Sequence, residues 1–427
     1  MRSDIWTKER RGTPLWLDEV PPLELVAPPL PASCDVAIVG AGYTGLNAAL
    51  ELARGGREVV VLEAGDPGHG CSTRNGGQVS ASLHVPLGAL TRRLGRERAV
   101  ALHREGENAL DWVEALVRRE GIDCDFVRSG HFHAAHTPRH FERLARGTDE
   151  DIEETFVVPP EAQHHELGTA IRHGGLVYPR HASLHPARYH RALLARAVEA
   201  GVSVVPHCRA SAIGPDRRGV VLSTSGGRMH AAQAIVASNG YTDTLVPWLR
   251  RRIVPIGSQV VATEPLPESL VDELLPTNRT VTDTRKVVYY YRASPDRRRI
   301  VFGGRVSVQD CGPEVGGPRL HAELCRLFPA LRGTRLSHAW SGSVAFSFDE
   351  LPHVGSHDGV HHALGYCGSG IAMASYLGAK LGRRLLDPDA GRTAFDGLPF
   401  PTRPLYTGRP WFLPAVIAWY RWRDRVG

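Results

Sequence analysis

The feature that most constrains the fold is a glycine triplet, Gly40-x-Gly42-x-x-Gly45, which follows an apolar run at residues 36–39. In such a triplet the first glycine permits a tight turn from strand to helix. The second lets the backbone approach a diphosphate, and the third lets the helix pack closely on the strand. The helix N-terminus adds free N–H groups and a partial positive charge. The segment therefore predicts a βαβ unit that binds a dinucleotide.

The residues that follow agree with this interpretation. Apolar residues recur with helical spacing from Leu46 to Ala53, and Gly55 ends the helix. Residues 59–62 form a second apolar run, which ends at Glu63. A carboxylate at this position accepts hydrogen bonds from ribose hydroxyls and disfavours a 2′-phosphorylated cofactor. FAD and NAD remain as candidates.

A polar, glycine-rich loop at residues 64–78 distinguishes between them, because an NAD enzyme would usually continue into a helix and a strand. Within it, residues 74–78 read Arg-Asn-Gly-Gly-Gln. This segment resembles the one that runs along the flavin in the D-amino-acid oxidase superfamily. Its guanidinium and backbone amides would supply donors for an electron-rich ring. The resemblance implies FAD as the cofactor.

Two distant segments extend the resemblance. Residues 231–241 resemble the late strand on which small residues pass under the cofactor, and residues 365–371 form a glycine-rich turn before a helix. The dipole of that helix would stabilise negative charge on the reduced flavin. The residues expected to bind FAD are Gly40, Gly42, Tyr43, Thr44, Gly45, Glu63, Ala64, Thr73, Arg74, Asn75, Gly76, Gly77, Gln78, Ala210, Ala237, Ser238, Asn239, Gly342, Gly368, Ser369, Gly370 and Ile371.

Within the superfamily, the chain resembles the gamma-glutamylputrescine oxidase branch. The resemblance rests on segments 3–6, 72–78, 239–242, 262–266, 289–292, 302–305, 340–342, 349–355 and 410–414. It implies oxidation of an amine at the C–H next to nitrogen, by hydride transfer to flavin N5. The resulting imine hydrolyses to an aldehyde or a keto acid. Because substrates of the branch carry a distant carboxylate, Arg292 or Arg305 is an expected anchor for it.

The fold class expected is α/β, with a Rossmann-like FAD-binding domain and an interleaved antiparallel-sheet domain that covers the flavin. A chain of 427 residues, 42% of them hydrophobic, suits two joined domains. The boundaries predicted are 34–84, 186–250 and 335–390 for the FAD-binding domain, 85–185 and 251–334 for the substrate domain, and 1–33 and 391–427 for terminal extensions. Strands of the second domain are expected at 126–134, 174–179, 254–263, 287–291 and 300–305, and helices at 98–119 and 186–200.

No side chain is strictly required as a base in this chemistry, so the catalytic candidates follow from position. They are His338 and Trp340 on the segment expected to border the flavin, and Tyr290 and Arg292 on the covering sheet. The two aromatic residues can equally be interpreted as core residues. His69 lies in the loop near the ring, where some superfamily members tether the flavin covalently. We expect non-covalent FAD, since residues 340–348 lack the cysteine that tethers it in sarcosine oxidases.

Composition excludes other classes. The formal net charge is +6, but the arginines are scattered in pairs and triplets, so nucleic-acid binding is not expected. The histidine pairs His131-x-His133, His164-His165 and His361-His362 lack companion ligands, which predicts surface residues and no metal site. Seven cysteines without paired spacing and a polar N-terminus predict a cytoplasmic protein. The aromatic tail at 411–423 would pack against the body of the protein or touch a bilayer.

The electron acceptor and the substrate stay open at this point. Sarcosine oxidases carry a lysine that promotes reaction with oxygen on the segment where this chain has Val301. Because the lysine is absent, the acceptor that reoxidises the flavin is either oxygen or another compound. One alternative is an amino-acid dehydrogenase, for D-amino acids, glycine or sarcosine, that passes electrons to a quinone at the membrane. A non-catalytic flavin-binding protein is the other.

Overall fold

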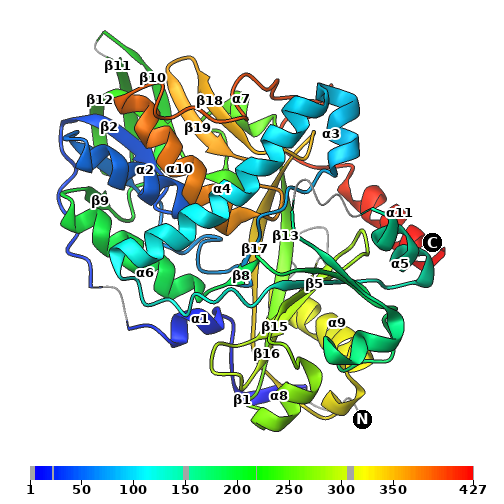
Figure 1. Cartoon of the computed structure of the whole chain (residues 1–427). Coiled ribbons are helices and arrows are strands. Elements are labelled where there is room, and N and C mark those ends of the chain that lie inside the picture. The colour runs from blue at the N-terminus through cyan, green and yellow to red at the C-terminus, as the bar shows by residue number, and fades with distance from the viewer. Residues whose placement is uncertain (1–4, 22–23, 148–152, 218, 305–311, 427) are drawn as a thin grey trace.

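The structure is a computed structural model that describes residues 5–21, 24–147, 153–217, 219–304 and 312–426. Two large sheets organise the chain, and helices lie on both of them (Figure 1). The first sheet runs in the order β10-β11-β12-β2-β3-β9, with β19 also paired to β12 and β18 paired to β19. Its strands are β2 (Ser33–Val39), β3 (Val59–Leu62), β9 (Ser203–Val205), β10 (Ala210–Asp216), β11 (Gly219–Thr224), β12 (Gly227–Val236), β18 (His353–His357) and β19 (Val360–Leu364).

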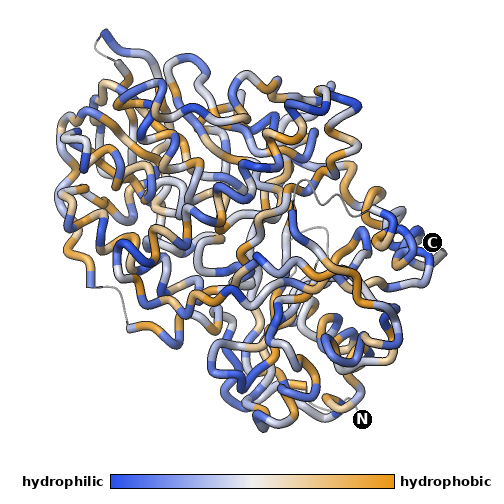
Figure 2. The backbone as a smooth tube through the Cα atoms, in the orientation of Figure 1, coloured by the Kyte–Doolittle hydropathy of each residue, from blue (hydrophilic) through white to orange (hydrophobic). Residues whose placement is uncertain are grey.

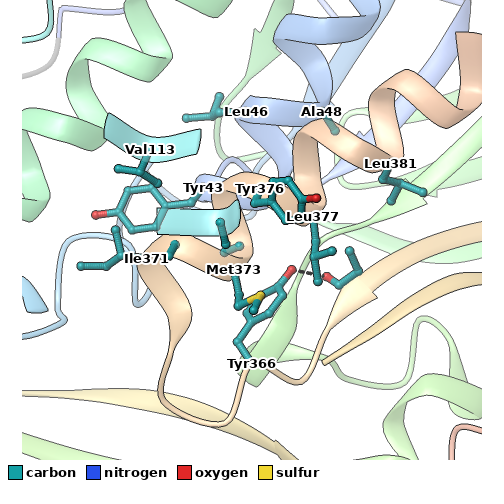
Figure 3. Packing of buried hydrophobic residues seen from close by; sticks show 14 of the residues in the cluster. Tyr43, Leu46, Ala48, Val113, Tyr366, Ile371, Met373, Tyr376, Leu377 and Leu381 are labelled. Carbon is teal, nitrogen blue, oxygen red and sulfur yellow. Dashed lines mark hydrogen bonds between the residues drawn. The ribbon is translucent and has the colours of Figure 1, made fainter. Parts of the chain in front are cut away.

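The centre of this sheet is parallel, because β12, β2, β3 and β9 pair in the same direction, as do β12 and β19. Four helices pack over it: α2 (Tyr43–Arg54), α4 (Arg96–Glu120), α6 (Pro186–Glu199) and α10 (Gly370–Leu386). Figure 3 shows Leu46 of α2, Val113 of α4 and Leu377 of α10 in one apolar cluster. Helices α2 and α10 approach closely, since a Cβ atom on Gly378 would lie 2.3 Å from the Thr44 carbonyl oxygen.

The second sheet runs in the order β1-β17-β13-β16-β15-β14-β5-β7-β6. Its strands are β1 (Trp6–Arg11), β5 (His131–Ala134), β6 (Phe156–Val158), β7 (Gly175–Tyr178), β13 (Ile253–Thr263), β14 (Thr280–Asp283), β15 (Tyr289–Ala293), β16 (Ile300–Gly304) and β17 (Leu336–Ser347). The prediction of an antiparallel sheet is wrong for two pairs, because β1–β17 and β5–β14 are parallel. The strands of each pair are far apart in sequence, so no hairpin sets their direction.

Shorter elements complete the chain. Helices α8 (Glu268–Leu274) and α9 (Gly312–Leu327) help to cover one face of the second sheet, where Phe302 and Leu324 belong to a separate apolar core. Hydrophobic stretches recur along the chain in both regions (Figure 2), and their buried side chains form a separate core in each. The remaining elements are α1 (Leu15–Asp18), β4 (Gln78–Val79), α3 (Leu87–Leu94), α5 (Pro138–Arg146), η1 (Pro160–His165), β8 (Ala182–Ser183), η2 (Asn239–Tyr241), α7 (Pro247–Arg250), η3 (Pro329–Leu331) and α11 (Leu413–Val426).

Chain order and sheet membership interleave. Strand β17 belongs to the second sheet, whereas β18, β19 and α10, which follow it, belong to the first region. Helix α4 packs with α2 and α10, although its sequence comes between β4 and the second-sheet strand β5. The domain boundaries given above stay a prediction, and these memberships describe the two regions used below.

The C-terminal helix α11 packs against the body of the protein. Leu413 and Ile417 are buried in a cluster with Val254 and Phe346. Trp419 and Trp422 remain half-exposed or more. None of the helices in the described residues is long and apolar enough to cross a membrane.

Candidate active site

A cavity of about 1700 Å³ is lined by both sheets and by α11. Most of the residues expected to bind FAD line it: Gly40, Gly42, Tyr43, Thr44, Glu63, Ala64, Arg74, Asn75, Gly76, Gln78, Ala210, Ala237, Ser238, Asn239, Gly342, Gly368, Ser369, Gly370 and Ile371. Gly45, Thr73 and Gly77 are adjacent to these residues in the chain but do not line the cavity. The structure thus brings segments from five distant parts of the chain to one surface.

The turn between β2 and α2 has the geometry that a dinucleotide needs. Gly40 has a φ of +109°, and a Cβ atom there would lie 3.0 Å from the Ala237 carbonyl oxygen. A Cβ atom on Gly45 would lie 1.9 Å from the Gly40 oxygen, so helix and strand are in direct contact. Gly42, the residue before α2, lines the cavity, and the Tyr43 amide at the start of the helix donates to the Ser72 hydroxyl at 3.1 Å. The positive end of the helix is therefore presented to a ligand.

Glu63 follows β3 at the edge of this turn. Its Oε2 accepts a hydrogen bond from the Ala41 amide at 2.9 Å, and its Oε1 accepts one from the Gly65 amide at 3.2 Å. These bonds hold the carboxylate at the cavity wall, where a ribose would donate to its remaining lone pairs. The donor set and the small residues around it fit a dinucleotide.

The Arg-Asn-Gly-Gly-Gln loop is held from behind by buried side chains. The Trp340 indole N–H donates to the Arg74 carbonyl oxygen at 2.9 Å, and the Trp16 indole N–H donates to that of Asn75 at 2.8 Å. The Arg292 guanidinium donates to the Gly77 carbonyl oxygen at 3.0 Å. Because these bonds fix the main chain of the loop, Asn75 and its neighbours line the cavity in a defined conformation.

None of the catalytic candidates His338, Trp340 and Arg292 lines the cavity, and a catalytic role for them stays a prediction. The His338 Nε2 atom lies 2.8 Å from the Asp18 Oδ2 atom, and burial lowers the pKa of this imidazole. Burial also lowers the pKa of Arg292 to about 10. Arg305, the other expected carboxylate anchor, lies outside the described residues.

Tyr290 is the catalytic candidate that does line the cavity. Its hydroxyl lies 3.0 Å from the Ser258 hydroxyl. Its ring lies against the loop, because a Cβ atom on Gly76 would come within 3.0 Å of the Tyr290 Cε2 atom. Tyr290 therefore joins the second sheet to the flavin-binding loop, and it stays a candidate for contact with the cofactor or the substrate.

Helix α10 begins at the cavity. Its first residues follow Gly368, whose φ is +112°, and Ser369 donates a hydrogen bond to the Ser82 carbonyl oxygen at 2.8 Å. The Tyr366 hydroxyl (Tyr366 is labelled in Figure 3) lies 2.7 Å from the Thr44 hydroxyl, which links the starts of α10 and α2. Two helix N-termini thus face one cavity, and both favour negative charge there.

Two residues of the segment that could tether a flavin also lie on the cavity wall. His69 is exposed, and its carbonyl oxygen accepts from the Arg74 Nε at 2.6 Å. Cys71 donates to the Ser343 carbonyl oxygen at 2.8 Å, and burial raises the pKa of its thiol, which makes it a poor nucleophile. All six cysteines of the described residues are free.

The covering sheet supplies a polar wall that sequence reasoning missed. His131, His133 and Tyr178 line the cavity, together with Thr280 and Thr282 of the neighbouring strand. The His131 Nε2 and the His133 Nδ1 atoms lie 2.7 and 2.8 Å from the Thr282 hydroxyl. Burial holds the pKa of His131 well below its usual range and lowers that of His133 to about 4, so both rings are neutral.

This wall corrects the expectation that the paired histidines lie at the surface. His131 is 8% exposed, and His362 is also buried, whereas His164 and His165 are exposed as expected. The alternation His131-Phe132-His133 is the sequence pattern that could have placed these histidines on the cavity side. Phe132 faces the second core, so its two neighbours must face the other way. Across the described residues, no group of three or more histidine, cysteine or acidic side chains could hold a metal ion.

The outer part of the cavity is walled by α11 and flanked by cations. Leu413, Ile417 and Tyr420 line it, as do the exposed Arg143 of α5 and Lys286. The Asp424 carboxylate of α11 accepts from the backbone amides of Lys286 and Val287 at 2.8 and 3.0 Å. Helix α11 therefore helps to hold the loop that carries Lys286. Neither this wall nor these cations were predicted from the sequence.

The fold and the glycine turn are those of a dinucleotide-binding protein. Residues 35–384 match the family described as FAD dependent oxidoreductase, DAO, and the chain belongs to that family. It is an FAD-dependent oxidoreductase.

Two relatives are similar in sequence to this chain over nearly its whole length. It is 32% identical over 420 residues to the probable oxidoreductase OrdL of Rhizobium meliloti (strain 1021), covering 96% of this chain and 97% of that protein. It is 31% identical over 410 residues to gamma-glutamylputrescine oxidoreductase of Escherichia coli (strain K12), covering 92% and 94%. The fold is similar to the crystal structure of glycine oxidase from Geobacillus kaustophilus, with a TM-score of 0.70 and 22% identity over 88% of this chain and 99% of that one.

Proposed function

We propose that this enzyme oxidises the C–H next to nitrogen in an amine that carries a distant carboxylate, as gamma-glutamylputrescine does. The observation that carries the proposal is the cavity, whose lining includes the FAD-binding turn, the His131–His133 wall and the cations Arg143 and Lys286. An amine placed at the flavin would reach these cations with its far end. The similarity to gamma-glutamylputrescine oxidoreductase supports the same substrate class.

Bound FAD supplies the acceptor for a hydride equivalent and thereby makes the oxidation possible. The residues of the chain position the amine and exclude water. The buried wall of His131 and Thr280 limits solvent, and Tyr290 lies between the second sheet and the loop. Holding the reacting carbon in van der Waals contact with the acceptor provides much of the rate acceleration. Water then hydrolyses the released imine to an aldehyde.

Anaerobic mixing of the holoenzyme with a panel of amines tests the proposal. Gamma-glutamylputrescine should bleach the flavin absorbance at lower concentration than butylamine, because only the former carries a carboxylate for Arg143 and Lys286. Glycine, sarcosine and D-alanine complete the panel. Bleaching by these amino acids alone would replace the proposed substrate with an amino acid.

A second candidate, an amino-acid dehydrogenase that passes electrons to a quinone at a membrane, is favoured by one observation. The tail exposes Trp411, Trp419 and Trp422 to 69%, 50% and 61%, and aromatic side chains of this kind suit a membrane interface. Flotation with vesicles of anionic lipid and an oxygen-electrode assay separate the two candidates. Rapid oxygen consumption by protein that stays out of the vesicle fraction would support the oxidase.

A further inference from the structure

Glu153 is an unusual member of the cavity wall. It is 9% exposed, and its Oε2 accepts a hydrogen bond from the Ser82 hydroxyl at 2.9 Å. Its Oε1 lies 2.7 Å from the His181 Nε2 atom but has no aligned hydrogen-bond donor. In the described part of the chain, no arginine or lysine pairs with this carboxylate. A buried acid with an unused acceptor is costly unless a cation arrives.

The other acids on the cavity wall are accounted for. Asp283 pairs with Arg172 at 3.0 Å, Asp243 pairs with Arg209 at 3.1 Å, and Glu63 accepts from two backbone amides. Glu350 is half-exposed and lies 3.7 Å from the His84 imidazole. Among the cavity-lining acids of the described residues, Glu153 is therefore the one that combines burial with an open acceptor.

The side chains around Glu153 are imidazole and phenol rings. The His181 ring stacks on Tyr178 at 5.0 Å between centroids and lies 5.6 Å from the ring of His131. His131 and His133 are neutral, since burial disfavours their charged forms. A cation that enters this part of the cavity meets the Glu153 carboxylate among these rings.

The position of Glu153 is also informative. Ser82 donates to the Glu153 carboxylate, and the carbonyl oxygen of the same serine accepts from Ser369 at 2.8 Å. Ser369 precedes α10, the helix expected to face the flavin. One residue, Ser82, therefore connects the carboxylate to the cofactor side of the cavity.

We propose that Glu153, supported by His181, binds the ammonium group of the amine beside the flavin. The inference rests on the proposed function and names the residue that recognises the reacting nitrogen. A primary ammonium would fill the open acceptor on Oε1 with a charge-assisted hydrogen bond. Oxidation requires the neutral amine, and the released proton passes from nitrogen to the Glu153–His181 pair, which leaves the amine its lone pair.

The test uses a ligand that cannot react. Tert-butylamine has no hydrogen on the carbon next to nitrogen, and tert-butanol is its uncharged counterpart. Binding of each to the holoenzyme is measured by the change that it causes in the flavin absorption spectrum. The wild-type enzyme should bind tert-butylammonium at least about tenfold more tightly than tert-butanol, since a hydrogen bond to a charged group is worth about 1.5–3 kcal/mol.

Glu153→Gln should remove this preference, weakening tert-butylammonium by about tenfold while leaving tert-butanol unchanged. Glu107→Gln is the matched control, because Glu107 is an acid that pairs with Arg180 and does not line the cavity. Equal binding of both ligands by the wild-type enzyme would overturn the proposal, and that measurement needs no variant. Because the probe is never oxidised, failure of every amine to bleach the flavin would count against the proposed function alone.

Discussion

The two walls of the cavity are built by different means. On the first-sheet side, the wall is formed mainly by backbone atoms and glycines, as at Gly40, Gly42 and the start of α10. On the covering side, side chains such as His131, Tyr178 and Tyr290 face the cavity from separate strands. A wall of backbone amides binds a group common to many enzymes, whereas a wall of side chains can change one residue at a time. The difference separates cofactor binding from substrate choice.

The largest expected effect comes from Gly45→Ala on the first wall. A Cβ atom there would lie 1.9 Å from the Gly40 carbonyl oxygen, so α2 must move away from β2. We expect loss of FAD and a lower melting temperature, by several degrees or more, because overpacking at such a contact costs about 1–3 kcal/mol or more. Thermal unfolding monitored by flavin fluorescence measures both.

Gly214→Ala provides the control, because a Cβ atom on Gly214 of the same sheet meets nothing within 4 Å. It should retain FAD and wild-type stability. If Gly45→Ala behaved like this control, the backbone of the turn would not define the first wall.

A smaller effect is expected for Glu63→Ala. Loss of the ribose contact and of the bonds to Ala41 and Gly65 should weaken FAD by about 1.5–3 kcal/mol, with the protein still folded. Equilibrium dialysis against FAD measures the change. Glu58→Ala, at the opposite end of β3, should leave the affinity unchanged. Equal affinities in the two variants would contradict the role of Glu63.

Acid should lower the free energy of unfolding through buried histidines on both sides of the cavity. Burial lowers the pKa of His190, whose Nε2 atom lies 2.7 Å from the Ala41 oxygen, to about 4, and it does the same for His133. The unfolded chain, with pKa values near 6.5, takes up protons first, so the free energy of unfolding falls as pH drops from about 6.5 towards 4.

His190→Gln and His133→Gln should each reduce that loss by about 1–2 kcal/mol at pH near 5. Urea unfolding at neutral and acidic pH gives the difference. Only His190→Gln should also change acid-induced release of FAD, because His190 supports the turn and His133 faces it from the covering sheet. An identical effect of both variants on FAD would erase the distinction between the walls.

The smallest effect is expected at the exposed cations. Arg143→Met or Lys286→Met should raise KM for gamma-glutamylputrescine by about two- to fivefold and leave KM for butylamine unchanged, because exposed charge pairs contribute little. Arg139→Met, on the same helix but away from the cavity, serves as the control. A parallel rise for both substrates would show that these cations do not contact a carboxylate.

The contrast between the walls also explains what the sequence could predict. Strand β3 has the expected bounds, and the turn at Gly40 and the start of α10 lie on the cavity as expected, because glycine spacing and apolar runs are local signals. The covering wall depends on the pairing of β5 with β14, which are far apart in sequence and parallel. Local patterns carry no information on that register, so His131 was predicted to lie at the surface and Glu153 received no role.

Trp340 and Arg292 show a related limit, since the sequence placed them near the loop and their catalytic role stays a prediction. Their segments do approach the flavin-binding loop, as the bonds to Arg74 and Gly77 show. Which face of a strand a side chain occupies is set by one residue of register. Sequence segments therefore predicted the neighbourhood, and only the structure could assign the side that each residue faces.

Helix α11 has a consequence for how such enzymes diverge. The family match ends at residue 384, whereas Leu413, Ile417 and Asp424, which wall the cavity or hold the loop of Lys286, lie beyond it. Substitutions in α11 can thus alter the entrance without changing the residues that form the FAD-binding turn. Relatives that match over residues 35–384 can therefore differ in the substrates that they admit, and α11 is the first element to compare between them.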